Sequence, residues 1–147
     1  MSKILSFPFL IAAISGIAMA IQGTINSALS QKTSLLSATL VVHILGTLVA
    51  LIAVLAWRSP LLKYPWVSVP WYLYLGGLLS VLIVGLVAVS IPKVGVCNAT
   101  TAIIIGQVSM AVLIDHFGWF GVNRLSWTPW QLMGIVLFAA GAKLLFR

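Results

Sequence analysis

The sequence predicts an all-α membrane protein with five transmembrane helices, and three observations lead to this fold class. Apolar residues make up 62% of the chain and charged residues only 6%, whereas an ordinary soluble domain carries about 25% charged residues. The apolar residues form five long runs, and a helix needs about 20 mostly apolar residues to cross a bilayer. Tryptophans and basic residues gather near the ends of these runs, as side chains at a membrane interface do.

The predicted helices are separated by short connections that carry helix-breaking residues. We expect helices over residues 5–29, 35–57, 71–91, 96–114 and 128–146. Three prolines crowd the connection before the third helix: Pro60, Pro65 and Pro70. Pro92 is expected to end that helix, and Thr128 followed by Pro129 is a typical N-cap and first-turn pair for the fifth helix. Because no long linker is present, residues 1–147 are predicted to form a single transmembrane domain.

The basic residues are balanced between the two predicted faces of the membrane. They occur singly and form no clustered patch, so nucleic acid is not an expected partner. Five spans place the two termini on opposite faces. The face of the N-terminus carries Lys3, Arg58, Lys63 and Arg124. The other face carries Lys32, Lys93, Lys143 and Arg147. The positive-inside rule therefore favours neither orientation.

This charge balance has two interpretations. A partner protein or another signal fixes one orientation, or the chain inserts in both orientations in comparable amounts. Two opposite copies would then pair as an antiparallel homodimer. Many secondary transporters are built from inverted repeats related by a two-fold axis in the membrane plane, and an antiparallel pair would supply that symmetry from two chains. We favour the second interpretation.

Polar residues inside the first two helices are candidate functional residues, because buried polar groups are costly in lipid. Gln22 and Asn26 lie four residues apart, on one face of the first helix. The second helix repeats this spacing in a polar stripe of Thr39, His43 and Thr47. The alternatives stay open: amides often bond to a neighbouring helix, threonine hydroxyls bond to carbonyls of their own helix, and His43 is either packed neutral between helices or carries a proton.

The fourth helix carries Asn98 and Gln107, and Asp115, the only acid in the chain, lies at its C-terminal end. A carboxylate near a helix C-terminus opposes the helix dipole. An ion pair with Arg124 or solvation at the interface would compensate for this. The functional alternative is a proton or cation site, in which Asp115 and His43 couple ion movement to transport.

Motifs of several enzyme classes are absent from the sequence. It contains no Walker motif for ATP hydrolysis, and its cysteine and histidines are too scattered for a zinc site. With a single acid at a membrane edge, no Ser/His/Asp arrangement is credible. We therefore expect no enzymatic activity, no metal and no cofactor.

Two motifs resemble a known family. The first is the stretch from Gly16 to Leu29, with Gln22 and Asn26, followed by Gly46-Thr47 in the second helix. The second is Gly106-Gln107 followed by Asp115-His-Phe-Gly-Trp. Together they resemble the YdcZ-like family of inner-membrane exporters in the drug/metabolite transporter (DMT) superfamily. This resemblance implies a multi-pass protein of the bacterial inner membrane, in which antiparallel homodimers of ten helices occur. The positions that match the family motifs are Gln22, Asn26, Gln107 and Asp115.

The function predicted from the sequence is secondary transport, without ATP, of a small metabolite or drug by alternating access in an antiparallel dimer. The expected partners are the substrate, the bilayer and a second copy of the chain. The predicted substrate contacts are Gln22, Asn26, His43, Asn98 and Gln107, and Asp115 is the predicted coupling or gating residue. The first helix lacks the central glutamate of the small multidrug exporters in that superfamily, so a neutral, zwitterionic or anionic substrate is favoured over a cationic drug. The alternatives are a dual-topology small ion channel and a non-transporting subunit of a larger membrane complex.

Overall fold

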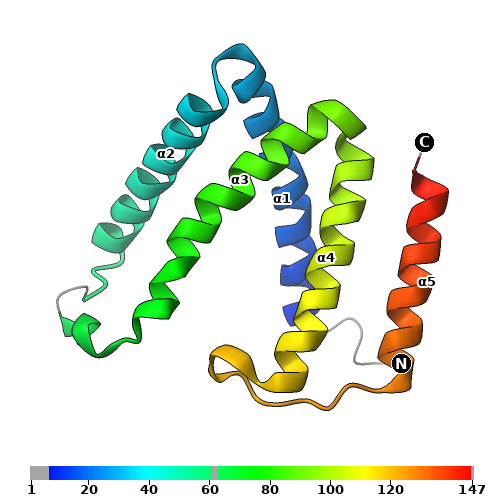
Figure 1. The fold of residues 1–147 in the computed structure, drawn as a ribbon. Coiled ribbons are helices and arrows are strands. Elements are labelled where there is room, and N and C mark those ends of the chain that lie inside the picture. The colour runs from blue at the N-terminus through cyan, green and yellow to red at the C-terminus, as the bar shows by residue number, and fades with distance from the viewer. Residues whose placement is uncertain (1–6, 61–62, 147) are drawn as a thin grey trace. The chain divides into compact units, whose positions relative to one another are not determined.

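A computed structural model of the chain describes residues 7–60 and 63–146, and its long elements are all α-helices (Figure 1). The helices are α1 (Phe7–Lys32), α2 (Leu35–Ala56), α3 (Leu75–Val94), α4 (Val96–Phe117) and α5 (Pro129–Leu145). Short 3-10 turns lie in the described parts of the connections: η2 (Trp66–Ser68), η3 (Trp71–Tyr74) and η4 (Trp119–Gly121). The chain divides into two compact units, of which the first ends at Pro92 and the second begins at Lys93.

Four of the helices are long and apolar enough to cross a membrane: Phe7–Lys32, Leu35–Ala56, Trp71–Val94 and Val96–Phe117. The remaining helix, α5, is apolar but has only 17 residues. On all five helices, large apolar side chains are exposed along almost the whole helix length. An all-α membrane protein is therefore confirmed, with four membrane-length helices and one shorter apolar helix.

The helix ends follow local capping chemistry. Ser34 begins α2, and its side-chain oxygen accepts a hydrogen bond from the backbone N–H of Ser37. The predicted start of α5 is confirmed: Thr128 caps the helix, Pro129 follows in the first turn, and Gln131 completes a capping box. Each of these caps supplies an acceptor for a backbone N–H that the first turn leaves without a partner.

The prediction that Pro92 ends the third helix is wrong, because α3 continues to Val94 with Pro92 inside it. A proline in a helix removes one N–H, the donor to the carbonyl four residues earlier. That carbonyl belongs to Ala88, and it accepts a hydrogen bond from the side chain of Ser27 on α1 instead. The helix therefore tolerates the proline in its last turn.

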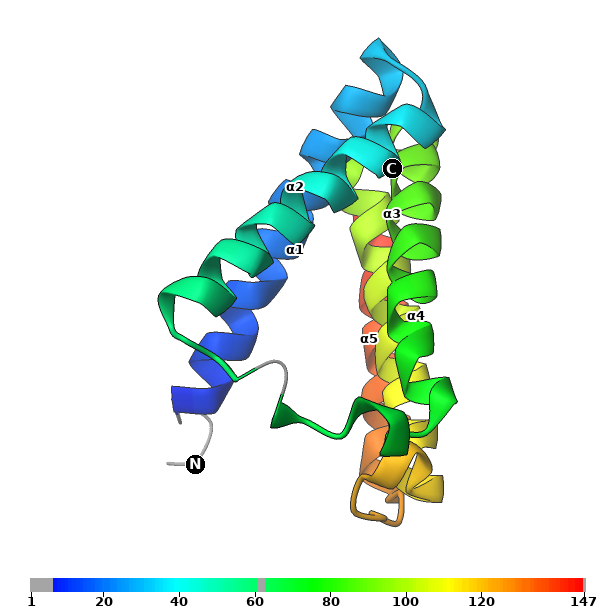
Figure 2. The ribbon, with the colours of Figure 1, turned by 90° about the vertical axis from the view of Figure 1, so that its left-hand side faces the viewer.

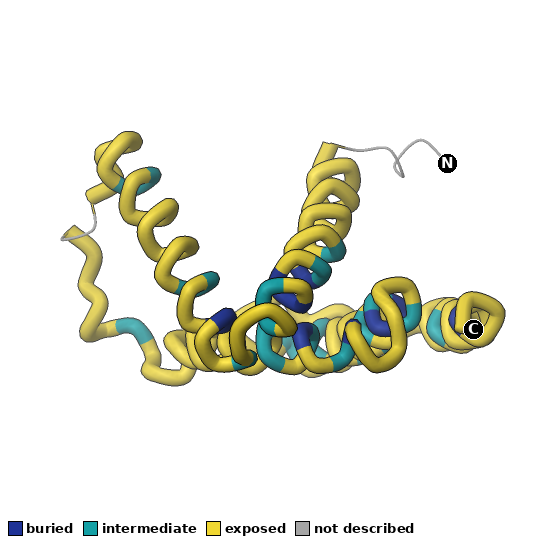
Figure 3. The backbone as a smooth tube through the Cα atoms, turned by 90° about the horizontal axis from the view of Figure 1, so that it is seen from above, coloured by how far each residue is buried: buried dark blue, intermediate teal, exposed yellow. Residues whose placement is uncertain are grey.

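Buried residues are few and mostly small (Figure 3). In the first unit they lie in the C-terminal half of α1, the N-terminal part of α2 and the C-terminal part of α3: Gly23, Asn26, Ser27, Ala38, Thr39, Ala88 and Ile91. In the second unit they are Ala99, Thr101 and Ala142, on α4 and α5. Figure 2 shows α1 and α2 as a hairpin of antiparallel helices. Small residues let helix backbones approach closely, which is how helices pack in lipid.

Candidate functional site

Asn26 is the buried amide of the first unit. It lies on α1, and only 6% of its surface is exposed. Among residues 7–60 and 63–146, its side chain has no hydrogen-bond partner. Its amide atoms keep a small exposed surface, since they are not among the fully buried unpartnered polar atoms of the described residues. Asn26 therefore has both a free donor and a free acceptor for a ligand.

Two other predicted contact residues, Gln22 and Gln107, are exposed near the middle of α1 and α4. Neither side chain forms a hydrogen bond within the described part of the chain. Gln22 lies one helical turn before Asn26, so the two amides share a face but differ in burial. An exposed amide at this depth would face lipid unless something else covers it, which has a free-energy cost.

His43 connects two helices of the first unit. Its Nδ1 lies 2.7 Å from the backbone oxygen of Thr39, and its Nε2 lies 2.9 Å from the hydroxyl of Ser80 on α3. A carbonyl oxygen can only accept, so Nδ1 must carry the proton that is donated to Thr39. In the neutral ring, Nε2 then accepts a hydrogen bond from Ser80. Both ring nitrogens are occupied, which matches a histidine packed between helices.

The threonines of the polar stripe bond to their own helix, as expected. Thr39 and Thr47 each donate a hydrogen bond of 2.8 Å to the carbonyl four residues earlier. Thr24 does the same on α1, at 2.9 Å. Their hydroxyl protons are therefore used within the helix.

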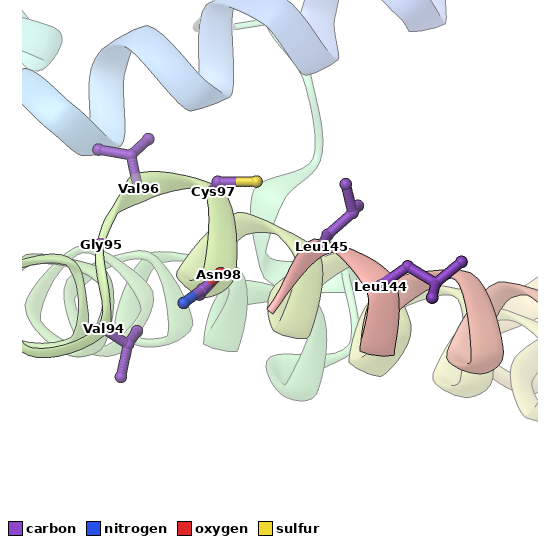
Figure 4. A pocket seen from close by; sticks show the side chains of 7 residues that line it. All are labelled: Val94, Gly95, Val96, Cys97, Asn98, Leu144 and Leu145. Atoms are coloured by element: carbon purple, nitrogen blue, oxygen red, sulfur yellow. The ribbon is translucent and has the colours of Figure 1, made fainter. Parts of the chain in front are cut away.

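Asn98 lies beside a cavity of about 540 Å³ in the second unit (Figure 4). The cavity is lined by residues 94–98, around the start of α4, and by Leu144 and Leu145 at the end of α5. Apart from the thiol of Cys97, the half-buried Asn98 supplies the only polar side chain of this lining. The cavity is large enough for a small molecule, but one amide in an apolar lining gives little selectivity.

Of the two ways considered for compensating the Asp115 carboxylate, the ion pair with Arg124 is not formed in the described structure. The guanidinium Nε of Arg124 donates a hydrogen bond of 2.9 Å to the backbone oxygen of His116. Leu125 donates its backbone N–H to the backbone oxygen of Asp115, at 2.7 Å. The segment after α4 thus occupies two of the carbonyls that a helix C-terminus leaves without donors. The half-buried carboxylate of Asp115 is left without an ion-pair partner among the described residues.

His116 packs against aromatic rings at the same end of α4. Its ring lies edge-to-face with Phe117 and with Trp127, at centroid distances of 4.9 and 6.1 Å. Its Nδ1 is buried and has no hydrogen-bond partner in the described structure. The His116 ring is therefore enclosed by aromatic side chains, directly beside Asp115 in the chain.

No hydrogen bond joins the predicted site residues to one another among the described residues, and those on α4 lie far apart. Asn26 and His43 belong to different helices, and His43 is bonded to Ser80 rather than to an amide. On α4, Asn98 and Asp115 are separated along the helix axis by about 25 Å. A small metabolite could not contact both of these residues at once.

Ser27 was not among the predicted site residues, and it is buried and hydrogen-bonded to Ala88 on another helix. The sequence does contain a feature that calls for such a hydroxyl. A proline within an apolar helix leaves a carbonyl that must find a donor from elsewhere in the bilayer, and Pro92 points to Ala88. What the sequence did not reveal is which hydroxyl would reach that carbonyl.

Comparison with known families identifies one match. A family model described as "Putative inner membrane exporter, YdcZ" matches residues 7–144, which include all six predicted site residues. Comparisons with curated proteins and with solved structures give no match.

Proposed function

Because the chain belongs to the YdcZ family of inner-membrane exporters, we propose that it is a secondary transporter of a small polar metabolite that works as an antiparallel homodimer. The chain is a multi-pass inner-membrane protein. The observation that carries the proposal is the family match over residues 7–144, in a chain whose helices are long and apolar. We infer from the absence of nucleotide-binding motifs that transport uses no ATP and that the protein is not an enzyme.

The proposal includes five spans, with α5 as the fifth. A helix of 17 residues is about 25 Å long and lies at the lower limit for spanning a bilayer. Lys143 near its C-terminal end can extend its ammonium group to the interface, which allows a short helix to span. An odd number of spans places the termini on opposite faces of the membrane.

A second, inverted copy would cover surfaces that a single copy leaves open. Gln22 and Gln107 are exposed on helices whose exposed side chains are mostly apolar. Amides that face lipid are unfavourable, whereas amides at a helix interface or in a wet cavity are tolerated. The balanced basic residues support insertion in both orientations. We infer that the two copies together form the transport pathway near the membrane midplane.

The side chains available along this pathway favour an uncharged, zwitterionic or anionic substrate. Asn26, Gln22 and Gln107 each offer a donor and an acceptor. The only acid is Asp115, in the last turn of α4. We propose Asp115 as the coupling or gating residue and Gln22, Asn26 and Gln107 as the residues that contact the substrate. Asn98 and His43 would lie behind these contacts.

The test is counterflow in proteoliposomes. Purified protein is reconstituted, the vesicles are loaded with an unlabelled compound, and uptake of the same labelled compound is followed. L-alanine, lactate and glucose serve as zwitterionic, anionic and neutral probes. Saturable uptake that internal substrate accelerates would support a transporter. Rapid flux without saturation would indicate a channel, and no flux of any compound beyond that of empty vesicles would favour a non-transporting subunit.

A further inference from the structure

Pro92 leaves the backbone oxygen of Ala88 without its helical donor, and α1 supplies a replacement. The hydroxyl of Ser27 donates to this oxygen at 3.3 Å. Ser27 is 1% exposed and Ala88 is 3% exposed, so water does not satisfy the carbonyl. Ser27 and Ala88 lie 61 positions apart in the chain. The hydrogen bond therefore connects α1 to α3 rather than stabilising one helix.

The backbones approach closely at this contact because Gly23 has no side chain. A Cβ placed on Gly23 would lie 3.0 Å from Cγ1 of Val87 and 3.6 Å from Cδ1 of Ile91. Gly23 and Ser27 are one turn apart on the face of α1 that meets α3. The close approach brings the short side chain of Ser27 within reach of the α3 backbone.

The same short segment holds Asn26, which is only 6% exposed and whose side chain forms no hydrogen bond in the described structure. A substrate that binds this amide must first reach it. Because Asn26 directly precedes Ser27, movement of this part of α1 away from α3 would change the surroundings of both residues.

We propose that the hydrogen bond from Ser27 to Ala88 is a releasable contact that holds α1 against α3 and keeps Asn26 covered. The role of Asn26 rests on the proposed transport function. Ser27 is a positioning residue, since it acts through Asn26. At 3.3 Å the bond is longer than the usual hydroxyl–carbonyl distance of about 2.7–2.8 Å, so it opens readily. Its rupture leaves the Ala88 oxygen without a donor because of Pro92, and this favours return to the closed arrangement.

The experiment measures the accessibility of position 26 without requiring transport. The native thiol is removed by Cys97→Ala, a thiol probe is introduced by Asn26→Cys, and the rate of labelling by N-ethylmaleimide is measured in membranes. Only a thiol in contact with water ionises and reacts quickly. Ser27→Ala should accelerate labelling by about five-fold, the factor expected from loss of one hydrogen bond. The matched controls are Ser30→Ala and Ser90→Ala, since both hydroxyls bond to carbonyls of their own helix.

A second variant tests the part played by the proline. Pro92→Ala restores an N–H that can donate to Ala88, so opening no longer leaves that oxygen without a donor. Pro92→Ala should therefore accelerate labelling as Ser27→Ala does, and the double variant should label no faster than either single variant. If the accelerations of labelling by Ser27→Ala and Pro92→Ala multiplied in the double variant, the proposal would be overturned. A labelling rate in Ser27→Ala equal to that in Ser30→Ala would overturn it as well.

The labelling result is independent of the transport result. If labelling responds as expected and no probe compound is transported, the contact stands and the transport function is overturned. If counterflow is found and Ser27→Ala leaves labelling unchanged, the transport function stands and the releasable contact is overturned.

Discussion

The imidazole of His43 and the hydroxyl of Ser80 join α2 to α3 by a hydrogen bond of 2.9 Å. Because Nδ1 donates to the Thr39 carbonyl, the neutral ring accepts at Nε2. We therefore expect His43 to stabilise the helix packing rather than to contact substrate. Ser80→Ala should lower the free energy of unfolding by about 1 kcal/mol and leave transport kinetics near wild type, as measured by thermal unfolding in detergent and by counterflow.

The control for this experiment is Thr47→Val. The Thr47 hydroxyl donates to the His43 carbonyl within α2 and makes no link between helices. Its replacement should change stability by less than about 0.5 kcal/mol. If Ser80→Ala abolished transport at unchanged stability, His43 would be a participant in transport, and the packing interpretation would be wrong.

Gly23 allows α1 to pack closely against α3, and an added methyl group should interfere. Gly23→Ala places a Cβ 3.0 Å from Val87 Cγ1, so the Val87 side chain or the helix that carries it must give by a few tenths of an ångström. We expect a loss of about 1–3 kcal/mol in unfolding free energy from this overpacking. Val87→Ala removes the opposing methyl groups and should restore part of that loss in the double variant. Thermal unfolding of the two single variants and the double variant gives the coupling energy.

Gly16→Ala is the matched control on the same helix, since a Cβ at Gly16 meets nothing within 4 Å. Alanine is the better helix former by about 1 kcal/mol, so this variant should be as stable as the wild type or slightly more stable. Equal effects of alanine at Gly16 and Gly23 would mean that the close approach of α1 and α3 does not contribute to stability.

Gly118 ends α4 in the left-handed conformation, with φ of 66°, and its N–H donates to the Ile114 carbonyl at 2.8 Å. A Cβ at this position would also lie 3.3 Å from the backbone oxygen of Val122. Gly118→Ala should therefore cost about 1 kcal/mol or more of stability. Gly134→Ala, inside α5 with nothing within 4 Å, is the control. A stability of Gly118→Ala at or above that of Gly134→Ala in thermal unfolding would contradict this account of the helix end.

Most of the fold could be predicted from the sequence because apolar runs and caps are local signals. The start of α5 at Thr128 and Pro129 is an example, since the N-cap and the first-turn proline are adjacent in the chain. The end of α3 was missed for a physical reason. A proline ends a helix unless another donor satisfies the freed carbonyl, and here the donor is Ser27, far away in the sequence.

The candidate site was less predictable, because it depends on contacts between distant residues. Asn26 stood out as an amide in an apolar helix. Ser27 did not, because a serine hydroxyl in a helix ordinarily bonds to its own backbone, as Ser30 does. The partner of His43 is likewise 37 positions away, and no pattern of residues links His43 to Ser80 in advance.

The exposed amides of Gln22 and Gln107 offer a test of the proposed pathway. Leucine at either position replaces an exposed polar group on a mostly apolar helix, so each variant should fold and assemble at least as well as the wild type. If the amides contact substrate, transport should fall by about ten-fold or more in each variant, the factor expected when a hydrogen bond to substrate in a dry site is lost. Counterflow and size-exclusion chromatography give the two readouts. Normal flux from either variant would remove that residue from the pathway.

The balanced basic residues predict that the chain inserts in both orientations, and topology reporters can test this directly. A reporter active only in the cytoplasm and another active only in the periplasm are fused separately to Arg147. Because four basic residues lie on each predicted face, both fusions should be strongly active. Adding two lysines beside Lys32 should then raise the signal of one reporter at the expense of the other. A single active reporter in the unaltered chain would exclude the antiparallel homodimer and point to an oppositely oriented partner protein.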